Sequence, residues 1–373
     1  MKIKIQKNVL LEALQLIVSI APKATSDRAI NNVLLETTPQ GISFKATNFE
    51  VSFWGQFPAQ IEEPGRCCLP IAKMFNLVRN FTASDVNLET TQQLWAMLSS
   101  GHTQIRLPGM DPDSFPPVAF SPLPNRFLMP ADQLKLTIDR TFFAIGENES
   151  RKNLMGLNLQ VKEPGRLAWM GADAFRISYN ETKIPGPTPE KGNLIIPKKS
   201  LVEVKKILDH SAGEIQVSYD DNVFQLESGD LKFKTRLIEA DYPNLESILS
   251  ALGPNQIQLP KGELLRSVRI LNTLYDADPN AVMKLTLKQD RVVVESQKLE
   301  GGEGMDVIYA DYQGEELSIG INIQFMLEAL QVVEPAPDAL VTFYFTGPVQ
   351  PCFLTAKAWP EFKIVLMPVK IKW

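Results

Sequence analysis

The stretch "LIIPKKSLVEVKKIL", residues 194–208, joins two kinds of secondary structure at a proline. Apolar β-branched residues precede Pro197, and such a run is typical of a strand. Proline suits the first turn of a helix, where its missing N–H has no partner to lose. After it, Leu201, Val204 and Leu208 are spaced as one apolar stripe of a helix. The stretch therefore predicts a strand that runs directly into an amphipathic helix.

The same junction occurs six times along the chain. Three copies begin successive thirds: "IKIQKNVLLEALQLIV" from Ile3, "RFLMPADQLKLTIDRTFFAI" from Arg126 and "QIQLPKGELLRSVRILNTL" from Gln256. The other three lie within the thirds: "CCLPIAKMFNLVRNF" from Cys67, the opening stretch, and "SIGINIQFMLEALQVV" from Ser318. The repeat is about 125–130 residues long, so each copy is a domain and not a solenoid unit.

Between the junctions lie several alternating or β-branched runs, such as "ISFKATN", "EIQVSYD" and "RVVVES", which predict antiparallel strands. Two helices packed on antiparallel sheet, three times over, make an α+β fold of three tandem repeats. Turn-rich stretches at 121–126 and 251–256 are the predicted boundaries. We therefore expect three domains, at residues 1–122, 123–253 and 254–373.

Composition limits the kind of protein this is. The chain has 373 residues, 44% of them hydrophobic, and a formal net charge of -5, which argues against a surface coated in nucleic acid but not against a local basic surface. Its three cysteines form neither a disulfide framework nor a zinc spacing, which predicts reduced thiols in a cytoplasmic protein. The apolar residues near the start follow helical spacing, so we expect a strand and a helix there and not a signal peptide.

No catalytic motif is evident in the sequence. It has two histidines, neither beside a nucleophile signature, and no phosphate-binding loop. The carboxylate pairs Asp111/Asp113 and Asp276/Asp278 lie in proline-containing loops, where solvated turns are the simpler interpretation than metal ligands. We expect no catalytic residue, metal or cofactor. The alternatives are a carboxylate-metal nuclease on a repeated scaffold, or an interaction module that forms no ring.

Three tandem domains of this pattern resemble the bacterial DNA polymerase III β subunit family, the sliding clamps. The resemblance covers the whole chain, and its further markers are "RLIEADYPNL" (236–245), "LSIGINIQFMLEAL" (317–330) and "IVLMPVKI" (364–371). It implies a non-catalytic processivity factor: two chains joined head to tail in a ring, with helices lining a hole for duplex DNA. It also implies the DNA polymerase III α subunit, the clamp loader and other proteins with clamp-binding motifs as partners. A divergent second clamp for a mobile element or a repair pathway is the alternative.

The resemblance turns the cations of the predicted inner helices into candidate phosphate contacts. Lys198 and Lys199 lie about two helical turns before Lys205 and Lys206, so the two pairs share a face. The alternative is an ordinary solvated face. The full predicted lining is Lys73, Arg79, Lys135, Arg140, Lys198, Lys199, Lys205, Lys206, Arg266 and Arg269.

The family also binds linear peptides of its partners between the second and third domains. Carried onto this chain, that pocket comprises Leu154, Ala172, Ala174, Phe175, Arg176, Ile177, Pro243, Ser247, Ile248, Asn322, Phe325, Val349, Val365, Leu366, Met367, Pro368 and Val369. Arg176 is expected to contact a carbonyl or carboxylate of the peptide. The chain departs from the family in "ADAFRI" (172–177), where Ala174 replaces a glycine and Phe175 a histidine. An interdomain core is the alternative for these apolar residues.

The family resemblance also implies a dimer interface. It would join the edge strand "TQIRLPG" of the first domain, through Ile105 and Leu107, to "RILNTL" of the third, through Ile270, Leu271 and Leu274. Edge strands carry unpaired backbone groups that favour such pairing.

Overall fold

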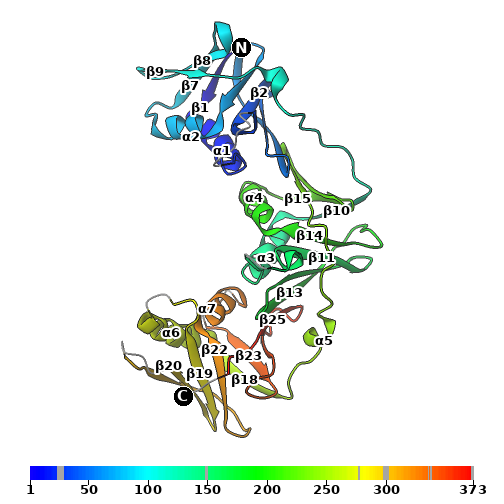
Figure 1. Ribbon diagram of the computed structural model, residues 1–373, viewed down its shortest axis with the longest axis vertical. Helices are drawn as coiled ribbons and strands as arrows, with labels where there is room; N and C mark the ends of the chain where they lie inside the picture. Colours follow the sequence, from blue (N-terminus) through cyan, green and yellow to red (C-terminus); the bar gives the residue numbers. More distant parts are fainter. Residues whose placement is uncertain are drawn as a thin grey trace. The chain divides into compact units, whose positions relative to one another are not determined.

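A computed structural model (Figure 1) describes residues 1–22, 29–147, 150–275, 278–296, 302–334, 336 and 338–370. The chain forms two compact units. Unit 1 comprises residues 1–135, 186–189 and 199–237, and unit 2 comprises residues 136–185, 190–198 and 238–373. The middle repeat is therefore shared between the units, while the first repeat lies in unit 1 and the third in unit 2.

Unit 1 contains two antiparallel sheets. The smaller has the strand order β5-β1-β7-β8-β9 and the larger β10-β15-β16-β17-β4-β3-β2-β6. Their bounds are β1 (Lys2–Gln6), β2 (Asn32–Thr38), β3 (Gly41–Thr47), β4 (Val51–Phe57), β5 (Gln60–Glu63), β6 (Arg66–Pro70), β7 (Asp85–Thr90), β8 (Trp95–Ser100), β9 (Thr103–Pro108), β10 (Asn125–Pro130), β15 (Glu214–Tyr219), β16 (Val223–Ser228) and β17 (Leu231–Arg236).

Unit 2 contains the other two sheets, of order β14-β11-β12-β13-β25-β24-β23-β18 and β21-β20-β19-β22. Their bounds are β11 (Gly156–Glu163), β12 (Arg166–Ala172), β13 (Arg176–Lys183), β14 (Asn193–Pro197), β18 (Asn255–Pro260), β19 (Val282–Lys288), β20 (Arg291–Ser296), β21 (Met305–Tyr309), β22 (Leu317–Asn322), β23 (Leu340–Phe345), β24 (Cys352–Ala356) and β25 (Phe362–Leu366).

The two eight-stranded sheets have the same topology and the same register where two repeats meet. In unit 1, β17 pairs antiparallel with β4, with Thr235 opposite Val51. In unit 2, β25 pairs antiparallel with β13, with Leu366 opposite Arg176. We call these two strand pairs the seams. Each seam joins one sheet of a repeat to one sheet of the next. The two become a single sheet, in which backbone N–H and C=O groups pair across the seam.

Each of six strands runs directly into a helix, as the sequence predicts. The helices that follow them are α1 (Lys7–Ile17), α2 (Ile71–Asn80), α3 (Ala131–Phe142), α4 (Lys198–Asp209), α6 (Lys261–Asn272) and α7 (Ile323–Val332). Four of these strands end in proline, at Pro70, Pro130, Pro197 and Pro260. At α7, Asn322 replaces proline, and its Oδ1 accepts a hydrogen bond from Phe325 N at 3.0 Å. The predicted α+β fold of three clamp-type repeats is confirmed.

The helices of the first and of the third repeat pack in pairs against the sheets. Within unit 1, α1 contacts α2, and within unit 2, α6 contacts α7 (Figure 1). Buried residues of α6 and α7, such as Leu264, Val268 and Met326, join one core with the strands of the third repeat. The elements that the sequence pattern missed include the edge strand β5 and the single-turn helix α5 (Glu246–Leu249), because both are too short to show a periodicity. No helix in the described ranges has the length and apolar character needed to cross a membrane.

The three cysteines provide a test of how the units unfold. Cys67 and Cys68 lie in unit 1 and Cys352 in unit 2, and burial raises the pKa of each thiol to about 12. Since the thiolate is the nucleophile, native thiols should react about 1,000-fold more slowly with iodoacetamide at pH 8 than exposed thiols. In a urea series read by mass spectrometry, we expect Cys67 and Cys68 to become reactive together and Cys352 to become reactive separately. Fast alkylation without urea would contradict the buried placement.

Candidate functional site

An apolar cluster covers one face of the large sheet of unit 2, beside its seam. We call it the outer cluster. Its buried members alternate along β12, β13, β24 and β25, and the segment 242–249 lies over them. The buried members are Leu154, Ala168, Met170, Ala172, Ile177, Tyr179, Leu249, Phe353 and Val365, and the partly buried Tyr242, Leu245, Ile248 and Tyr344 pack against them.

The same face of the unit 1 sheet is polar at nearly every equivalent position. The shared register of the two ladders makes Ser43, Lys45 and Thr47 the counterparts of Ala168, Met170 and Ala172. By the same count, Ser52 and Trp54 replace Ile177 and Tyr179, while Lys234 and Gln225 replace Val365 and Phe353. Only Trp54 keeps apolar bulk. Because the backbone is common to both sheets, the outer cluster is a property of side chains selected in unit 2 and not a requirement of the fold.

Large apolar side chains remain exposed where β13 begins and β25 ends. Phe175 is 57% exposed, and its carbonyl accepts a hydrogen bond from Met367 N at 2.8 Å. Val369 N donates to the carbonyl of Gly320, which ties the last described residues to β22. Phe175 also stacks on Phe325 of α7, with ring centroids 6.2 Å apart. Because single domains rarely leave such groups together in water, this face is a candidate interaction surface.

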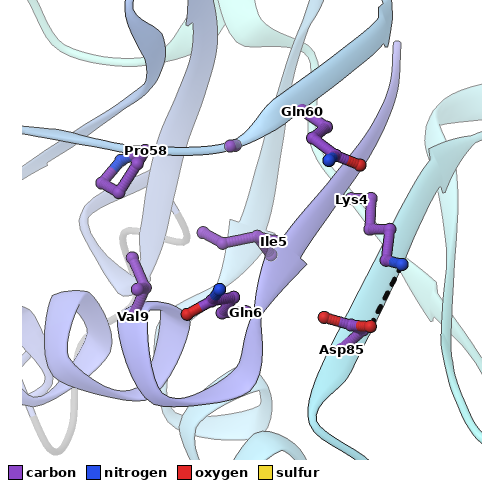
Figure 2. A pocket seen from close by; sticks show the side chains of 8 residues that line it. Lys4, Ile5, Gln6, Val9, Pro58, Gln60 and Asp85 are labelled. Atoms are coloured by element: carbon purple, nitrogen blue, oxygen red, sulfur yellow. Dashed lines mark ion pairs between the residues drawn. The ribbon is translucent and has the colours of Figure 1, made fainter.

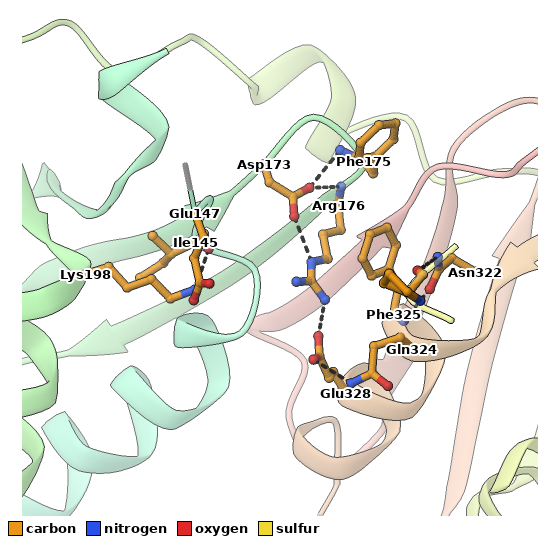
Figure 3. A network of polar contacts seen from close by, with 11 residues as sticks. Ile145, Glu147, Asp173, Phe175, Arg176, Lys198, Asn322, Gln324, Phe325 and Glu328 are labelled. Atoms are coloured by element: carbon orange, nitrogen blue, oxygen red, sulfur yellow. Dashed lines mark hydrogen bonds and ion pairs between the residues drawn. The ribbon is translucent and has the colours of Figure 1, made fainter. Parts of the chain in front are cut away.

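Arg176 binds the turn before β13 to helix α7 (Figure 3). Its Nε donates to Asp173 Oδ2 at 2.9 Å, and its Nη1 donates to Glu328 Oε2. The guanidinium lies over the rings of Phe325 and Phe143, at 4.3 and 5.3 Å from their centroids. Asp173 Oδ1 also accepts hydrogen bonds from the backbone N–H groups of Phe175 and Arg176, which fixes the turn.

This network changes the role expected for Arg176. Its side chain is only 11% exposed, and two carboxylates already hold it. The expected contact with a carbonyl or carboxylate of a bound peptide is therefore corrected to an internal one, in which Arg176 positions the aromatic pair. Sequence reasoning missed Asp173 and Glu328, since Glu328 is far from Arg176 in the chain and only the fold brings them together.

The remaining predicted pocket residues fall into three groups. Leu154, Ala172, Ile177 and Val365 belong to the outer cluster, and Ile248 packs against it. Ala174, Ser247, Val349, Met367 and Val369 are exposed, and Pro243 and Pro368 are partly exposed. Asn322 is buried as the cap of α7, and Leu366 points into the core of the third repeat, so neither side chain lies on this surface. The strand alternation would have identified the missed members Met170, Tyr179 and Phe353.

The predicted phosphate contacts differ in how accessible they are. Five are exposed on their helices: Lys73, Arg79, Lys199, Arg266 and Arg269. Lys135 and Lys206 are partly exposed and form ion pairs with Asp209 and Glu203, while Lys205 is partly exposed. Lys206 also donates to Ser19 Oγ, so part of its hydrogen-bonding capacity is used between α4 and the segment after α1.

Two of the predicted phosphate contacts are wrong. Arg140 is 4% exposed and lies 4.0 Å from the Trp359 ring centroid and 4.8 Å from that of Phe362. Lys198 is 14% exposed at its side chain, pairs with Glu147 at 2.9 Å and donates to Ile145 O at 2.7 Å. Both cations are therefore held by contacts within unit 2, those of Lys198 being visible in Figure 3, and neither is available to a phosphate.

The predicted dimer residues also divide by burial. Ile270 is 53% exposed, and Ile105 and Leu274 are partly exposed. Leu107 and Leu271 are buried within their own repeats, so their side chains expose little surface, and the predicted interface stays a prediction. Sequence spacing could not separate them, since adjacent residues of a helix differ in facing by about 100°.

A pocket of about 340 Å³ lies in unit 1 where β5 separates from β1 (Figure 2). It is lined by Lys4, Ile5, Gln6, Val9, Pro58, Ala59, Gln60 and Asp85. Lys4 and Asp85 form an ion pair at 3.1 Å across its mouth, with both side chains about two-fifths exposed. Half of its lining residues are apolar, and none is a serine, cysteine or histidine, so the pocket is mixed in character and does not resemble a nucleophilic catalytic site.

Among the described residues, no group of His, Cys, Asp and Glu could hold a metal ion. Asp111 Oδ1 caps a turn by accepting from Asp113 N at 3.0 Å, and Asp113 pairs with Arg66. These two carboxylates are therefore used locally. Asp276 lies outside the described residues, so its predicted turn with Asp278 is not placed.

Comparison with known proteins identifies relatives over the whole chain. Family models of the DNA polymerase III beta subunit match in three parts: the N-terminal domain at residues 1–119, the central domain at 128–244 and the C-terminal domain at 249–370. The beta sliding clamp of Bacillus subtilis is 26% identical over 99% of this chain and all of its own length. The crystal structure of the Bacillus subtilis sliding clamp aligns over both full chains with a TM-score of 0.91. A Caulobacter crescentus beta sliding clamp, 24% identical, aligns over 100% of this chain and 99% of its own with a TM-score of 0.93.

Replacing Arg176 tests its internal role. Arg176→Ala leaves the carboxylates of Asp173 and Glu328 without their shared cation, so unit 2 should lose about 2–3 kcal/mol of stability. The measurement is the urea midpoint at which Cys352 becomes reactive, and Cys67 and Cys68 should keep their midpoint. Arg79→Ala, at an exposed cation of α2, is the matched control and should change the unfolding free energy of either unit by less than about 0.5 kcal/mol. Equal effects of the two variants would contradict the role of Arg176 in joining the turn before β13 to α7.

Proposed function

The chain belongs to the DNA polymerase III beta subunit family of sliding clamps, and we propose that it acts as a ring-shaped homodimer around duplex DNA in the cytoplasm. In this role it carries out no chemistry. It tethers the replicative polymerase and other factors, which reach it through short peptides, to the template. A topological link of this kind raises the local concentration of the tethered enzyme without any tight contact to DNA. The observation that carries the proposal is the pair of seams. The strands equivalent to those that form the seams are β9 in the first repeat and β21 in the third, and each is left as an edge strand.

The repeat indicates which strands close the ring. Each seam joins the last strand of one sheet, β17 or β25, to the strand β4 or β13 of the preceding repeat. The corresponding strands are β9 in the first repeat and β21 in the third, and among the described residues each pairs on one side only, as an edge strand of its sheet. We propose that β9 of one copy pairs antiparallel with β21 of the other, and that two such pairings close the dimer.

The seams also predict the register of this pairing. Counted from the hairpin turns, Gln104, Ile105 and Arg106 correspond to Lys232, Phe233 and Lys234 of β17. By the same count, Met305, Gly304 and Glu303 correspond to Trp54, Phe53 and Ser52. We therefore expect Gln104 opposite Met305, Ile105 opposite Gly304 and Arg106 opposite Glu303.

Side chains along this register are complementary. A Cβ at Gly304 would lie 2.8 Å from Leu271 and 3.1 Å from Leu274, so glycine allows these α6 side chains to pack directly against the backbone at this position. Ile105 of the other copy would then meet Leu274 and the exposed Ile270. Arg106 would lie opposite Glu303, and opposite charges facing each other across strands stabilise a pairing by about 0.2–1 kcal/mol.

The exposed helix cations support the contact with DNA. The chain is acidic overall, yet Lys73, Arg79, Lys199, Arg266 and Arg269 are exposed on α2, α4 and α6. Such cations bind phosphates without reading sequence, which suits a ring that must move along the duplex. Helix α7, by contrast, contains no cation and presents Gln324 and Glu328 at its surface. Contact with DNA should therefore be uneven around the ring.

The outer cluster and the exposed residues beside it are the proposed site for partner peptides. Buried Ile177 and Val365 supply the floor, and exposed Phe175, Met367 and Val369 supply flexible and aromatic walls. Surfaces rich in methionine and aromatic side chains suit peptides with apolar anchors. The polar face at the unit 1 seam acts as an internal comparison, since the same backbone there lacks these side chains.

Cysteine pairs test the proposed ring closure. Residues opposite each other in an antiparallel pair have Cα atoms about 4.5–5.5 Å apart, within the reach of a disulfide. The double variant Gln104→Cys/Met305→Cys should therefore form a closed, covalent dimer on mild oxidation, seen at twice the chain mass without reductant. Gln104→Cys/Tyr309→Cys is the control, because a shift of four residues separates the thiols by about 13 Å. Equal cross-linking of the two variants, or none in either, would contradict the register.

Charge reversal on α4 tests the contact with DNA. Lys199→Glu/Lys205→Glu should lower the fraction of protein that stays on nicked circular DNA after loading, and each lost phosphate contact should reduce the salt dependence of log K by about 0.9. The matched control is Lys183→Glu, a lysine exposed on β13 and not on a helix. Linearising the DNA should release the wild-type protein. If the protein stays bound to linear DNA, or if the control has the same effect, the proposed ring around DNA is wrong.

A further inference from the structure

We infer that the peptide surface of this chain selects an apolar anchor flanked by a basic residue and disfavours an acidic one. The inference rests on the proposed function of the outer cluster and adds the charge of its ligand. It comes from the network around Arg176, which gives the aromatic pair Phe175–Phe325 a carboxylate neighbour and a guanidinium that two carboxylates already hold (Figure 3).

The aromatic pair provides the place for the anchor. The Phe175 and Phe325 rings stack with 30° between their planes, and more than half of Phe175 is exposed. Met367 is held beside Phe175 by the backbone hydrogen bond between them. An aromatic or aliphatic side chain of a peptide would cover these apolar groups and gain the free energy of removing them from water.

The charge beside this pair is negative. Asp173 and Glu328 share the single guanidinium of Arg176, so the three side chains together carry one uncompensated negative charge. Glu328 is the most accessible of them, with 29% of its side chain exposed, against 11% for Asp173 and for Arg176. The nearby cation Lys198 is paired with Glu147 and contributes no excess positive charge.

Helix geometry brings this charge to the anchor. Glu328 follows Phe325 by three residues on α7, so the two side chains share a face one turn apart, about 5–6 Å between Cβ atoms. Glu328 Oε2 accepts from Arg176, and Oε1 accepts from Gln324 Nε2 at 2.8 Å, which orients the carboxylate while leaving lone pairs for a further donor. A lysine or arginine next to the anchor would reach it, whereas an aspartate there would be repelled.

The test uses two fluorescein-labelled, N-acetylated octapeptides that share a Leu-Phe anchor and differ by Lys or Asp beside it. At about 50 mM salt, we expect the Lys peptide to bind the full-length protein roughly 5-fold more tightly, as a partly exposed ion pair allows. Glu328→Gln should bring the two Kd values together. Glu316→Gln, which removes an exposed carboxylate elsewhere in unit 2, should leave their ratio unchanged. Retained protection of Cys352 from alkylation shows that each variant is folded.

The outcomes separate this inference from the proposed function. If Phe175→Ala weakens both peptides about equally while their ratio persists, the site and its charge preference both stand. If neither peptide binds the wild-type protein, the proposed peptide site fails and the inference fails with it. If both bind equally, or the Asp peptide binds more tightly, the peptide site stands and the charge preference is overturned. A ratio unchanged in Glu328→Gln overturns the assignment to Glu328.

Discussion

Antiparallel pairing across the seams is the interaction on which the rest of the structure depends. At each seam a strand of one repeat pairs with a strand of the repeat before it. The backbone N–H and C=O groups along that edge find their hydrogen-bond partners only in the neighbouring repeat. A chain of three such repeats contains two seams and leaves one strand of each type over, β9 and β21. The same pairing that joins two repeats within each unit therefore supplies the edges from which a ring is proposed to close.

One backbone carries two different surfaces at the two seams. In unit 1, Lys45 pairs with Glu36 and Lys234 donates to the carbonyl of Ala119, so the face is polar and its charges are satisfied locally. In unit 2, Met170 and Val365 occupy the equivalent positions and join an apolar cluster. The apolar face of one seam and the polar face of the other thus differ in side chains alone, while the hydrogen-bonded ladder stays the same.

Much of the fold could be predicted from the sequence. The spacing of Leu201, Val204 and Leu208 after Pro197 predicted strand and helix correctly, because amphipathic periodicity and proline act locally. The apolar positions of the outer cluster could also be found, since strand alternation marks them. The exposure and pairing of individual charged side chains could not be predicted. Lys198 and Lys199 are adjacent in sequence, yet Lys198 is paired with Glu147 and Lys199 is exposed. Such differences depend on what lies opposite a helix turn, and that partner comes from elsewhere in the chain.

The sequence alone determined the repeat, the class of fold and the helices that carry excess lysine and arginine, because these follow from local periodicity and from composition. Only the tertiary structure decided that Arg140 stacks on Trp359 and that Arg176 holds α7 through Glu328, since residues far apart in sequence meet there. It also decided which residues of a helix face solvent, as with exposed Ile270 beside buried Leu271. The physical reason is that burial and ion pairing are properties of contacts, and a sequence specifies contacts only through the fold it adopts.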